Sequence, residues 1–319
     1  MKIDRLNATI LKELLIDARK TFTEIAQQCG ESMEVIASRY RQMKKQGIIV
    51  GATIQNSCAC YDSNFVAAFN VYTRPHKTAA AKKLLSDFPN VIGVYPFGID
   101  PSLFNAVFAL KSIPELERNR QAIKRLPEVL EVDPQLWVGI RNTPENLSIL
   151  DIGATAKTEN NKPKENSYRQ IDEIDKYIIE KLVVDSRTPF SKIAEKLKIS
   201  TDTVSKRYEK LKQNNHVRPV IQINPVKVGY PAYAFFMMQF SEDHLNKSLE
   251  ALSAMPDINL IHKIGGKFDC WATLMIKDID QFTTEQEKIL HLDHLTKVEV
   301  TVHKIFDVWP LPREFISTF

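Results

Sequence analysis

Hydrophobic residues near the start of the chain recur with the spacing of an amphipathic α-helix. After Asp4, a suitable N-cap residue, leucine and isoleucine occupy positions 6, 10, 11, 14 and 15, which share one helical stripe. A second, short helix is expected to begin at Thr21, whose spacing to Glu24 fits a capping box. A third, longer helix is expected after Ser32, another cap residue that follows a short turn. A short helix, a tight turn and a capped longer helix predict a helix-turn-helix.

The same pattern returns 168 residues later. Residues 4–49 align with residues 172–217 without a gap, and 12 of the 46 positions are identical. In the second copy Asp172 and Ser200 are the expected cap residues, and Thr188-Pro189 is a cap followed by proline at the first helical position. The hydrophobic pattern continues to match more faintly beyond the helices. A repeat of this extent predicts a tandem duplication of a unit of roughly 150 residues.

Each helical block is followed by strand and helix patterns in the order βαββαβ, beginning with VAAFNVYT in the first copy and AYAFFMMQF in the second. These patterns predict an α+β fold: two copies of a winged helix-turn-helix domain, each followed by a βαββαβ ferredoxin-like domain. The helices should cover one sheet face and leave the other free to pair. The expected boundaries are 1–56 and 170–224 for the winged helix-turn-helix domains, 62–140 and 229–311 for the βαββαβ domains, and 141–169 for a polar, flexible linker.

Composition places the chain among ordinary soluble proteins. Of its 319 residues, 44% are hydrophobic and 26% are charged, and no apolar run approaches the roughly 18 residues of a membrane span. The four cysteines are too few and too scattered for a disulfide scaffold or a zinc finger. We therefore expect a cytoplasmic protein with reduced thiols and no signal peptide.

Positive charge is concentrated in the two helical blocks. Residues 1–50 carry nine Lys/Arg and six Asp/Glu, and residues 169–220 carry twelve and eight, whereas the remainder is slightly negative. An outward basic face on the third helix suits a DNA major groove, and the alternative is a merely solvated amphipathic helix. Arg39 and Arg207 lie on the flank of that face, where each suits a backbone phosphate or an intramolecular ion pair. The candidate DNA-contacting residues are Ser32, Glu34, Ser38, Arg39, Arg41 and Lys45 in the first copy, and Ser200, Asp202, Lys206, Arg207 and Lys210 in the second.

These residues resemble the N-terminal signature of the Lrp/AsnC family, also called feast/famine regulators. The first copy matches it at Asp4, Asn7, Ile10-Leu11, Asp17, Arg19, Ile25-Ala26, Ser32, Arg39, Met43 and Gly47-Ile48-Ile49. The second copy departs clearly only at the last triplet, which is Asn215-His216-Val217. The resemblance implies a sequence-specific transcription regulator whose partner is double-stranded DNA. It also implies a homodimer or higher oligomer formed through βαββαβ domains of the RAM type.

A small effector such as an amino acid is a further implication of the resemblance. The family's effector loop has Gly-x-x-Asp at the hairpin between the second and third strands, and the segment from Gly266 to Asp269 matches it. The corresponding segment of the first copy, Gly98 to Ser102, lacks the aligned Asp and contains a proline. The expected effector-binding residues are therefore Gly265, Gly266 and Asp269. The alternative is that the glycines serve only the turn.

Two other functions are open. Fused pairs of Lrp-like units also occur among the siroheme decarboxylases of haem biosynthesis, which carry His-Asn-Tyr and then Arg on the strand before the hairpin. Here only Tyr95 and a displaced His262 match, and no catalytic, metal-ligating or nucleotide-binding motif occurs. We therefore expect no enzyme, no catalytic residue, no cofactor and no metal. The third function is a protein-interaction module that has lost DNA binding, which weak salt dependence of any DNA binding would indicate.

Overall fold

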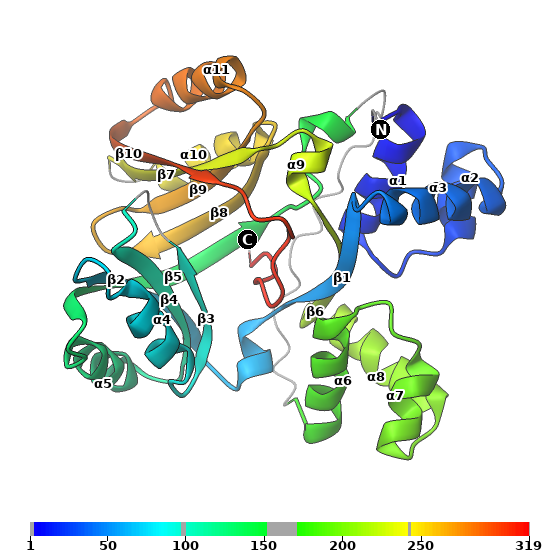
Figure 1. The fold of residues 1–319 in the computed structure, drawn as a ribbon, viewed down its shortest axis with the longest axis horizontal. Coiled ribbons are helices and arrows are strands. Elements are labelled where there is room, and N and C mark those ends of the chain that lie inside the picture. Colours follow the sequence, from blue (N-terminus) through cyan, green and yellow to red (C-terminus); the bar gives the residue numbers. More distant parts are fainter. Residues whose placement is uncertain (1–2, 97–99, 152–170, 242–243, 319) are drawn as a thin grey trace.

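The computed structural model describes residues 3–96, 100–151, 171–241 and 244–318. Two helical bodies, here called head 1 and head 2, lie on one side of the molecule and the large sheet lies on the other (Figure 1). The fold is α+β, with two helix-turn-helix domains and two βαββαβ units. Head 1 contains α1 (Arg5–Ile16), α2 (Phe22–Cys29) and α3 (Met33–Lys45), and head 2 contains α6 (Glu173–Val184), α7 (Phe190–Leu197) and α8 (Thr201–Gln213).

Side-chain caps begin five of these six helices at the expected residues. The carboxylates of Asp4 and Asp172 accept hydrogen bonds from the backbone N–H three residues ahead, as do the hydroxyls of Ser32 and Ser200. Thr21 forms the expected capping box at the start of α2. These helix starts could therefore be predicted from single residues, because an N-cap side chain accepts a hydrogen bond from a backbone N–H group in the first turn of its own helix.

The start of α7 differs from the expectation. Pro189 is the N-cap residue itself, in an extended conformation, and the helix begins at Phe190 without a side-chain cap. Thr188 lies one residue too far from the helix to accept a hydrogen bond from its first turn.

The segments expected to form a wing on each head form one shared ribbon. β1 (Ile49–Asn56) follows head 1, and β6 (Val217–Ile223) follows head 2. The two strands pair antiparallel with each other, with Ala52 opposite Ile221. Each head therefore has no two-stranded wing of its own within the described residues. Each copy contributes one strand, and that strand pairs with the strand of the other copy.

This ribbon interlocks the two heads. Ile54 of β1 lies in the hydrophobic core of head 2, whereas Ile221 of β6 lies in the core of head 1. Both side chains are fully buried. Backbone hydrogen bonds repeat the exchange: Ala18 N, at the end of the first helix of head 1, donates to Pro219 O of β6 at 2.9 Å. Neither head therefore has a complete core without the strand from the other copy.

Each half continues into a βαββαβ unit. Unit 1 contains β2 (Phe65–Thr73), α4 (Thr78–Ser86), β3 (Val91–Pro96), β4 (Leu103–Leu110), α5 (Ile113–Lys124) and β5 (Val129–Asn142). Unit 2 contains β7 (Ala232–Phe240), α10 (Leu245–Ala254), β8 (Ile258–Gly265), β9 (Cys270–Ile276), α11 (Ile279–Leu290) and β10 (Leu295–Lys304). The units share one eight-stranded sheet of order β10-β7-β9-β8-β5-β2-β4-β3, joined where Ile140 of β5 lies opposite His262 of β8.

Helices cover only one face of each unit (Figure 1). The core beneath α4 and α5 contains Phe69 and Phe108, and the core beneath α10 and α11 contains Phe236 and Leu274. The sequence predicted that the other face of each unit would be free to pair. In the structure these two uncovered faces are turned toward each other within the one chain. Together they line a common cavity, described below.

Residues 141–151 belong to the folded core rather than to a flexible linker. β5 continues through Asn142, and the short helix η2 (Ser148–Leu150) follows. The segment has the polar composition of a linker, yet Leu147 and Leu150 are buried in the core of head 1. The rest of the expected linker lies outside the described residues.

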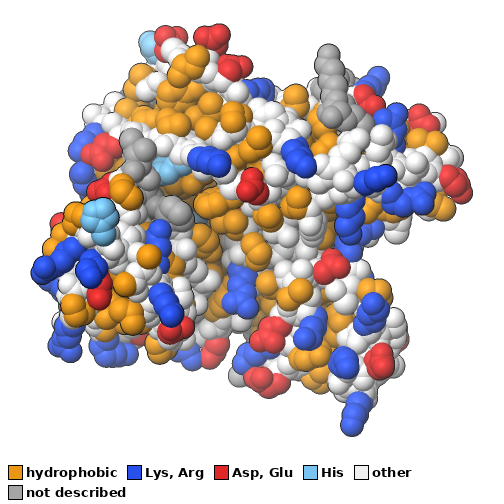
Figure 2. Space-filling view, viewed as in Figure 1, with side chains coloured by type: hydrophobic (Ala, Val, Ile, Leu, Met, Phe, Trp, Pro, Cys, Tyr) orange, Lys and Arg blue, Asp and Glu red, His pale blue; other side chains and the backbone are white. Residues whose placement is uncertain are grey.

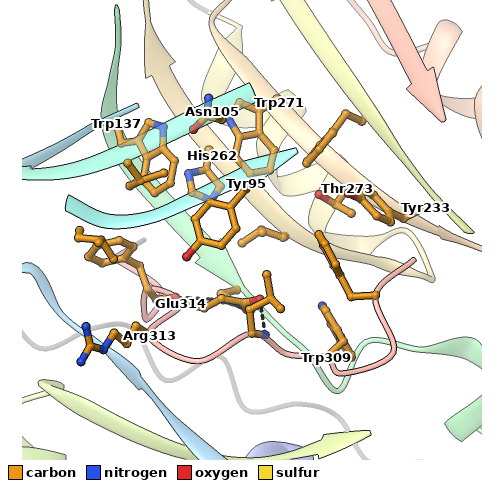
Figure 3. A pocket seen from close by; sticks show the side chains of 18 of the residues that line it. Tyr95, Asn105, Trp137, Tyr233, His262, Trp271, Thr273, Trp309, Arg313 and Glu314 are labelled. Atoms are coloured by element: carbon orange, nitrogen blue, oxygen red, sulfur yellow. Dashed lines mark hydrogen bonds between the residues drawn. The ribbon is translucent and has the colours of Figure 1, made fainter. Parts of the chain in front are cut away.

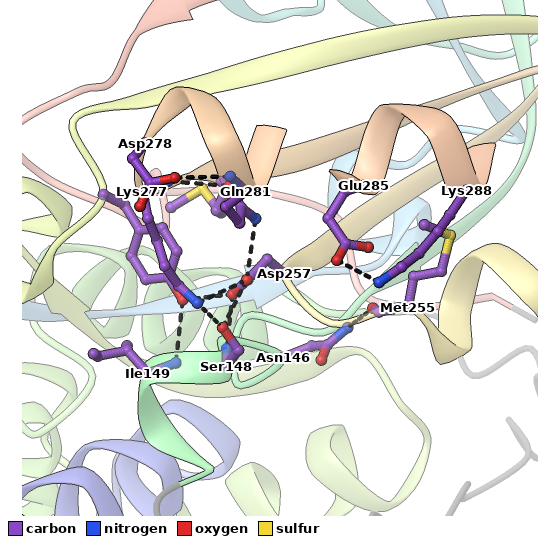
Figure 4. A network of polar contacts seen from close by, with 12 residues as sticks. Asn146, Ser148, Ile149, Met255, Asp257, Lys277, Asp278, Gln281, Glu285 and Lys288 are labelled. Atoms are coloured by element: carbon purple, nitrogen blue, oxygen red, sulfur yellow. Dashed lines mark hydrogen bonds and ion pairs between the residues drawn. The ribbon is translucent and has the colours of Figure 1, made fainter. Parts of the chain in front are cut away.

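A buried carboxylate anchors this segment to unit 2 (Figure 4). Asp257, in the turn before β8, accepts hydrogen bonds from Ser148 N and Ser148 Oγ, each at 2.7 Å, and from Tyr230 Oη at 2.5 Å. Lys277 Nζ lies 3.3 Å from the same carboxylate. Asp257 is 1% exposed, so this network compensates a charge that is removed from water.

Residues 305–318, here called the tail, run between the ribbon and the sheet. Trp309 exchanges two backbone hydrogen bonds with Ile223 of β6, of 2.7 and 2.9 Å. Asn56 of β1 donates to Glu314 O at 2.8 Å and accepts from Ile316 N at 3.1 Å. The second βαββαβ domain was expected to end at residue 311, but the folded chain continues to residue 318 and touches both strands of the ribbon.

Candidate DNA interface and central cavity

The third helix of each head carries the side chains that the sequence assigned to DNA. Figure 2 shows Lys and Arg side chains on both heads, interspersed with Asp and Glu. Contact of these residues with DNA stays a prediction. The exposed members are Ser32, Glu34, Ser38, Arg41 and Lys45 on or before α3, and Ser200, Asp202, Lys206 and Lys210 on or before α8.

Arg39 and Arg207 form intramolecular ion pairs in the structure. Arg39 Nη1 lies 2.7 Å from the carboxylate of Asp4, and Arg207 Nη1 lies 2.7 Å from Asp172 and 2.9 Å from Asp175. Hydrogen bonds to these two carboxylates raise the pKa of Arg207. Each arginine ties the third helix of its head to the N-terminus of the first helix. Of the two roles that the sequence left open, the ion pair is therefore the one observed.

The outward face of α8 carries an exposed ion pair. Lys206 Nζ lies 2.8 Å from Asp202, one helical turn away, and both side chains are at least 70% exposed. An exposed pair of this kind contributes little to stability, so Lys206 can exchange its partner for a phosphate at small cost.

Two arginines from equivalent positions cross the interface between the heads. The guanidinium of Arg19 lies 3.9 Å from the centroid of the Phe190 ring, and that of Arg187 lies 5.1 Å from the centroid of the Phe22 ring. Nη1 of each arginine donates to a backbone carbonyl of the opposite head at 2.6 Å. Arg19 matches the family signature and Arg187 occupies the equivalent position of the second copy, but spacing alone does not reveal that each faces the opposite copy. Arg19 also lies 5.4 Å from the ring centroid of Tyr208 on α8, and Arg187 lies 5.3 Å from that of Tyr40 on α3, so each arginine contacts the third helix of the opposite head.

In the hairpin expected to bind an effector, the acidic side chain of Asp269 forms a hydrogen bond within the protein. The carboxylate of Asp269 accepts a hydrogen bond from Phe240 N at 2.8 Å, which ties the hairpin to β7. Gly266 has φ +147, a conformation that favours glycine, and Gly265 ends β8 beside Leu136. The turn role is thus visible in the geometry, and an effector role for Gly265, Gly266 and Asp269 stays a prediction.

A cavity of about 140 Å³ lies where the inner sheet faces meet the tail (Figure 3). All three tryptophans of the chain line it: Trp137 from β5, Trp271 from β9 and Trp309 from the tail. His262 of β8 stacks on Trp271 with ring centroids 3.9 Å apart, and its centroid lies 4.2 Å from that of Trp137. Tyr95 of β3 lines the same cavity. The sequence named Tyr95 and His262 separately, but no fixed spacing indicated that the tryptophans would gather around them.

Ionisable side chains of the cavity favour their neutral forms. Burial lowers the pKa of His262 well below its usual value and raises the pKa of Tyr95 to about 12. Burial also raises the pKa of Glu314 to about 7, although this carboxylate accepts a hydrogen bond from Asn142 Nδ2 at 3.2 Å. The guanidinium of Arg313 belongs to an exposed residue of the lining. At neutral pH a bound molecule would therefore meet a neutral histidine and a neutral tyrosine, beside a Glu314 carboxyl group that is only partly ionised.

Within the residues that the structure describes, no group of three or more His, Cys, Asp or Glu side chains could hold a metal ion. The same residues include no helix with the length and apolar character of a membrane span.

Comparison with known proteins matches both heads. A family model of the AsnC-type helix-turn-helix domain covers residues 3–44 and 171–212. The HTH-type transcriptional regulator LrpA of Pyrococcus horikoshii is 32% identical over 130 residues, which are 40% of this chain and 92% of the relative. An uncharacterised HTH-type transcriptional regulator of Pyrococcus abyssi is 25% identical over 148 residues, which are 46% of this chain and 94% of the relative. Such relatives correspond to one half of the duplicated chain.

A solved structure resembles the chain over almost its whole length. The siroheme decarboxylase NirDL superposes with a TM-score of 0.63 and 16% identity, covering 99% of this chain and 94% of that one. At this identity the likeness shows the fold alone. It nonetheless overturns the expectation that the chain is not an enzyme, because an enzyme carries the same tandem architecture from end to end.

The family of the chain follows from the domain matches and from the match to a whole regulator. Two AsnC-type domains are present, and the match to LrpA covers nearly all of that regulator at more than 30% identity. The corresponding strands of the two halves pair with each other, so the repeat is present in the structure as well as in the sequence. The chain belongs to the Lrp/AsnC family, as a tandem-duplicated member.

Proposed function

We propose that this chain is a DNA-binding transcription regulator whose two heads act as one fixed pair. The observation that carries the proposal is the reciprocal exchange between the heads, in which the β1–β6 ribbon and the contacts of Arg19 and Arg187 set α3 relative to α8. The regulator relatives and the exposed basic residues on both third helices support it. Two-headed DNA readers commonly obtain the second head by dimerising, whereas here one chain supplies both.

The two heads present unlike outward faces. Arg41 and Lys45 lie on the first, whereas Lys206 and Lys210 lie on the second. The operator is therefore expected to be an imperfect palindrome, with half-sites separated by about one helical turn, roughly 34 Å, or by a multiple of it. Covalent linkage raises the effective concentration of the second head once the first has bound.

Modulation by a small effector is part of the same proposal. The hairpin with Gly265, Gly266 and Asp269 is the site that an amino acid would use, and further pairing of chains would proceed through the βαββαβ units. Calorimetric titration of the purified chain with amino acids tests this component separately from DNA binding.

The decisive experiment is genome-wide selection of DNA bound by the purified protein, followed by gel shifts of the best fragment at 50 and 200 mM salt. We expect a two-part motif and a steep loss of affinity with salt, because phosphate contacts release counterions. Arg41→Ala and Lys206→Ala should each weaken binding, while Lys124→Ala, an exposed lysine of α5, serves as the matched control. Absence of enrichment by a folded protein, or enrichment of single half-sites alone, would contradict the proposal.

One observation favours a second candidate function, a decarboxylase acting on a tetrapyrrole. Tyr95 and His262, the two residues that partly match the siroheme decarboxylase pattern, line the same cavity although they come from different halves of the chain. Incubation with siroheme and mass analysis of the product tests this candidate. Loss of carboxyl groups as CO₂ that depends on His262 would favour the enzyme, and recovery of unchanged siroheme would exclude it.

A further inference from the structure

Three walls of different origin enclose the central cavity (Figure 3). Unit 1 contributes side chains from β3, β4 and β5, and unit 2 contributes side chains from β7, β8 and β9. The tail supplies the third wall with Trp309, Glu314 and Phe315, among others. The two strand sets come from halves of the chain that have diverged, so the cavity has no internal symmetry and its polar atoms are unlike on its two sides.

Three buried polar atoms in the lining residues have no hydrogen-bond partner within the described structure: Trp137 Nε1, His262 Nδ1 and Thr273 Oγ1. They come from the adjacent strands β5, β8 and β9. Buried polar atoms in folded proteins are nearly always paired, so three unpaired atoms around one cavity indicate a missing partner. The indole N–H of Trp137 donates, whereas the ring nitrogen of His262 and the hydroxyl group of Thr273 can each donate or accept. These groups together suit a ligand that both donates and accepts hydrogen bonds.

The remainder of the lining sets the chemical class. Aromatic rings dominate it, since Tyr95, Tyr233, Phe235, Phe306 and Phe315 accompany the three tryptophans. A flat aromatic ligand can stack on such walls or meet their edges. We expect its buried part to be uncharged, because His262 is 3% exposed, burial favours the neutral form of its ring, and the guanidinium of Arg313 belongs to an exposed residue of the lining.

Size narrows the class further. A cavity of about 150 Å³ in another protein holds benzene, so a cavity of this volume accommodates one aromatic ring with a small substituent. A tetrapyrrole, with four such rings, requires the tail to move away. We propose that the central cavity, with the tail closed, is a binding site for a phenol-like molecule: one uncharged aromatic ring bearing an oxygen that pairs with Trp137, His262 and Thr273.

The tail connects this site to both heads. Trp309 lines the cavity and pairs with Ile223 of β6, and Glu314 lines the cavity and pairs with Asn56 of β1. A molecule beneath the tail therefore favours the conformation in which these hydrogen bonds are formed. Protection of the Ile223 and Asn56 amides against hydrogen exchange reports this effect without any DNA.

The test uses the full chain and the probe 4-fluorophenol, observed by ¹⁹F NMR. We expect saturable binding with a dissociation constant on the order of 0.1–1 mM, as befits so small a ligand. 4-Fluorobenzoate, which carries a charge, and fluorobenzene, which lacks the hydroxyl group, should each bind at least tenfold more weakly. Binding of the phenol should slow exchange of the Ile223 and Asn56 amides.

Two variants locate the site. Thr273→Val removes the unpaired hydroxyl at nearly constant volume and should weaken binding about three- to tenfold with the fold intact. Leu260→Trp fills the cavity and should abolish binding, whereas Leu290→Trp on the exposed face of α11 is the matched control. Unsaturable binding by the wild type, full binding by both cavity variants, or benzoate binding as tightly as the phenol overturns the proposal. Tight siroheme binding by a protein that ignores the phenol also overturns it.

Discussion

Asn215 adopts in the second copy the left-handed backbone conformation that Gly47 adopts in the first, with φ +54 against +67. Both residues lie in the turn between the third helix of a head and the ribbon strand. Asparagine is among the few side-chain-bearing residues that tolerate this region, so the turn survives the loss of glycine. The one clear departure of the second copy from the family pattern therefore leaves the path of β6 unchanged.

Replacing Asn215 with alanine should destabilise the protein by about 1–2 kcal/mol, because alanine lacks the tolerance of asparagine for positive φ. The variant also loses the hydrogen bond from Asn215 Nδ2 to Ser317 O of the tail. Urea unfolding of Asn215→Ala and Asn215→Gly separates the two effects, since glycine relieves the strain but loses the same hydrogen bond. Equal losses in both variants would show that the backbone conformation carries no cost.

The reciprocal arginines should matter more for paired DNA sites than for single ones. Arg19→Ala removes a cation–π contact and charge-assisted hydrogen bonds, which together amount to about 2–3 kcal/mol of stability. Gel shifts should show affinity for a two-part operator falling about tenfold, with affinity for an isolated half-site almost unchanged. Arg187→Ala should behave alike, and Arg125→Ala, at the exposed end of α5, should have no effect. Equal loss on both kinds of site would argue that these arginines contact DNA instead.

The network around Asp257 should be essential for joining the halves. Asp257→Ala leaves Lys277, Ser148 and Tyr230 without their common acceptor, and removing one partner of a buried pair typically costs about 3–5 kcal/mol. Thermal and urea unfolding measure the loss, and Asp280→Asn on exposed α11 is the control. A loss below about 1 kcal/mol would show that Asp257 is not the anchor of residues 141–151.

Glu314 should make stability depend on pH. Its pKa in the folded protein is about 7, raised by burial from the ordinary value of 4.5, so the folded state holds this proton more tightly than the unfolded state. The contribution to stability is therefore complete below about pH 4.5 and is lost as the pH rises toward 7. Of the groups that face this carboxyl group, Tyr95 has a pKa raised to about 12, far above that window, and Asn142 is not ionisable.

The measurement compares wild type with Glu314→Gln by urea unfolding at pH 5 and pH 8. Relative to the variant, the wild type should lose on the order of 1–3 kcal/mol between these values. A constant difference across the range would mean that the carboxyl group titrates alike in the folded and unfolded states.

The elements that could be predicted from sequence are those determined by neighbours along the chain. The side chains of Asp4, Thr21 and Ser32 each accept a hydrogen bond from a backbone N–H group three residues ahead. The duplication gives the second copy a similar pattern of cap residues. The order βαββαβ followed from local periodicity in the same way. The sequence left two roles open for Arg39, and its ion pair with Asp4 is visible only in the folded structure.

What could not be predicted depends on contacts between distant segments. β1 and β6 are both apolar strands, and nothing in either indicates that its partner residues lie 161 to 174 positions away rather than nearby. Leu147 and Leu150 belong to a short apolar group within a polar stretch, and only the folded chain shows that this group packs into the core of head 1. The three tryptophans of the cavity come from three separate elements, and part of the wall supplied by the tail lies beyond residue 311, the expected end of the second βαββαβ domain.

The ribbon that joins the heads has one more consequence. A symmetric dimer on a palindrome looks the same from either end of its site, so its binding carries no direction. Here two unlike heads are locked into one arrangement, and turning the molecule around would place the wrong head on each half-site. A bound chain would therefore point one way along the DNA, and its tail and cavity would always face the same flank of the operator.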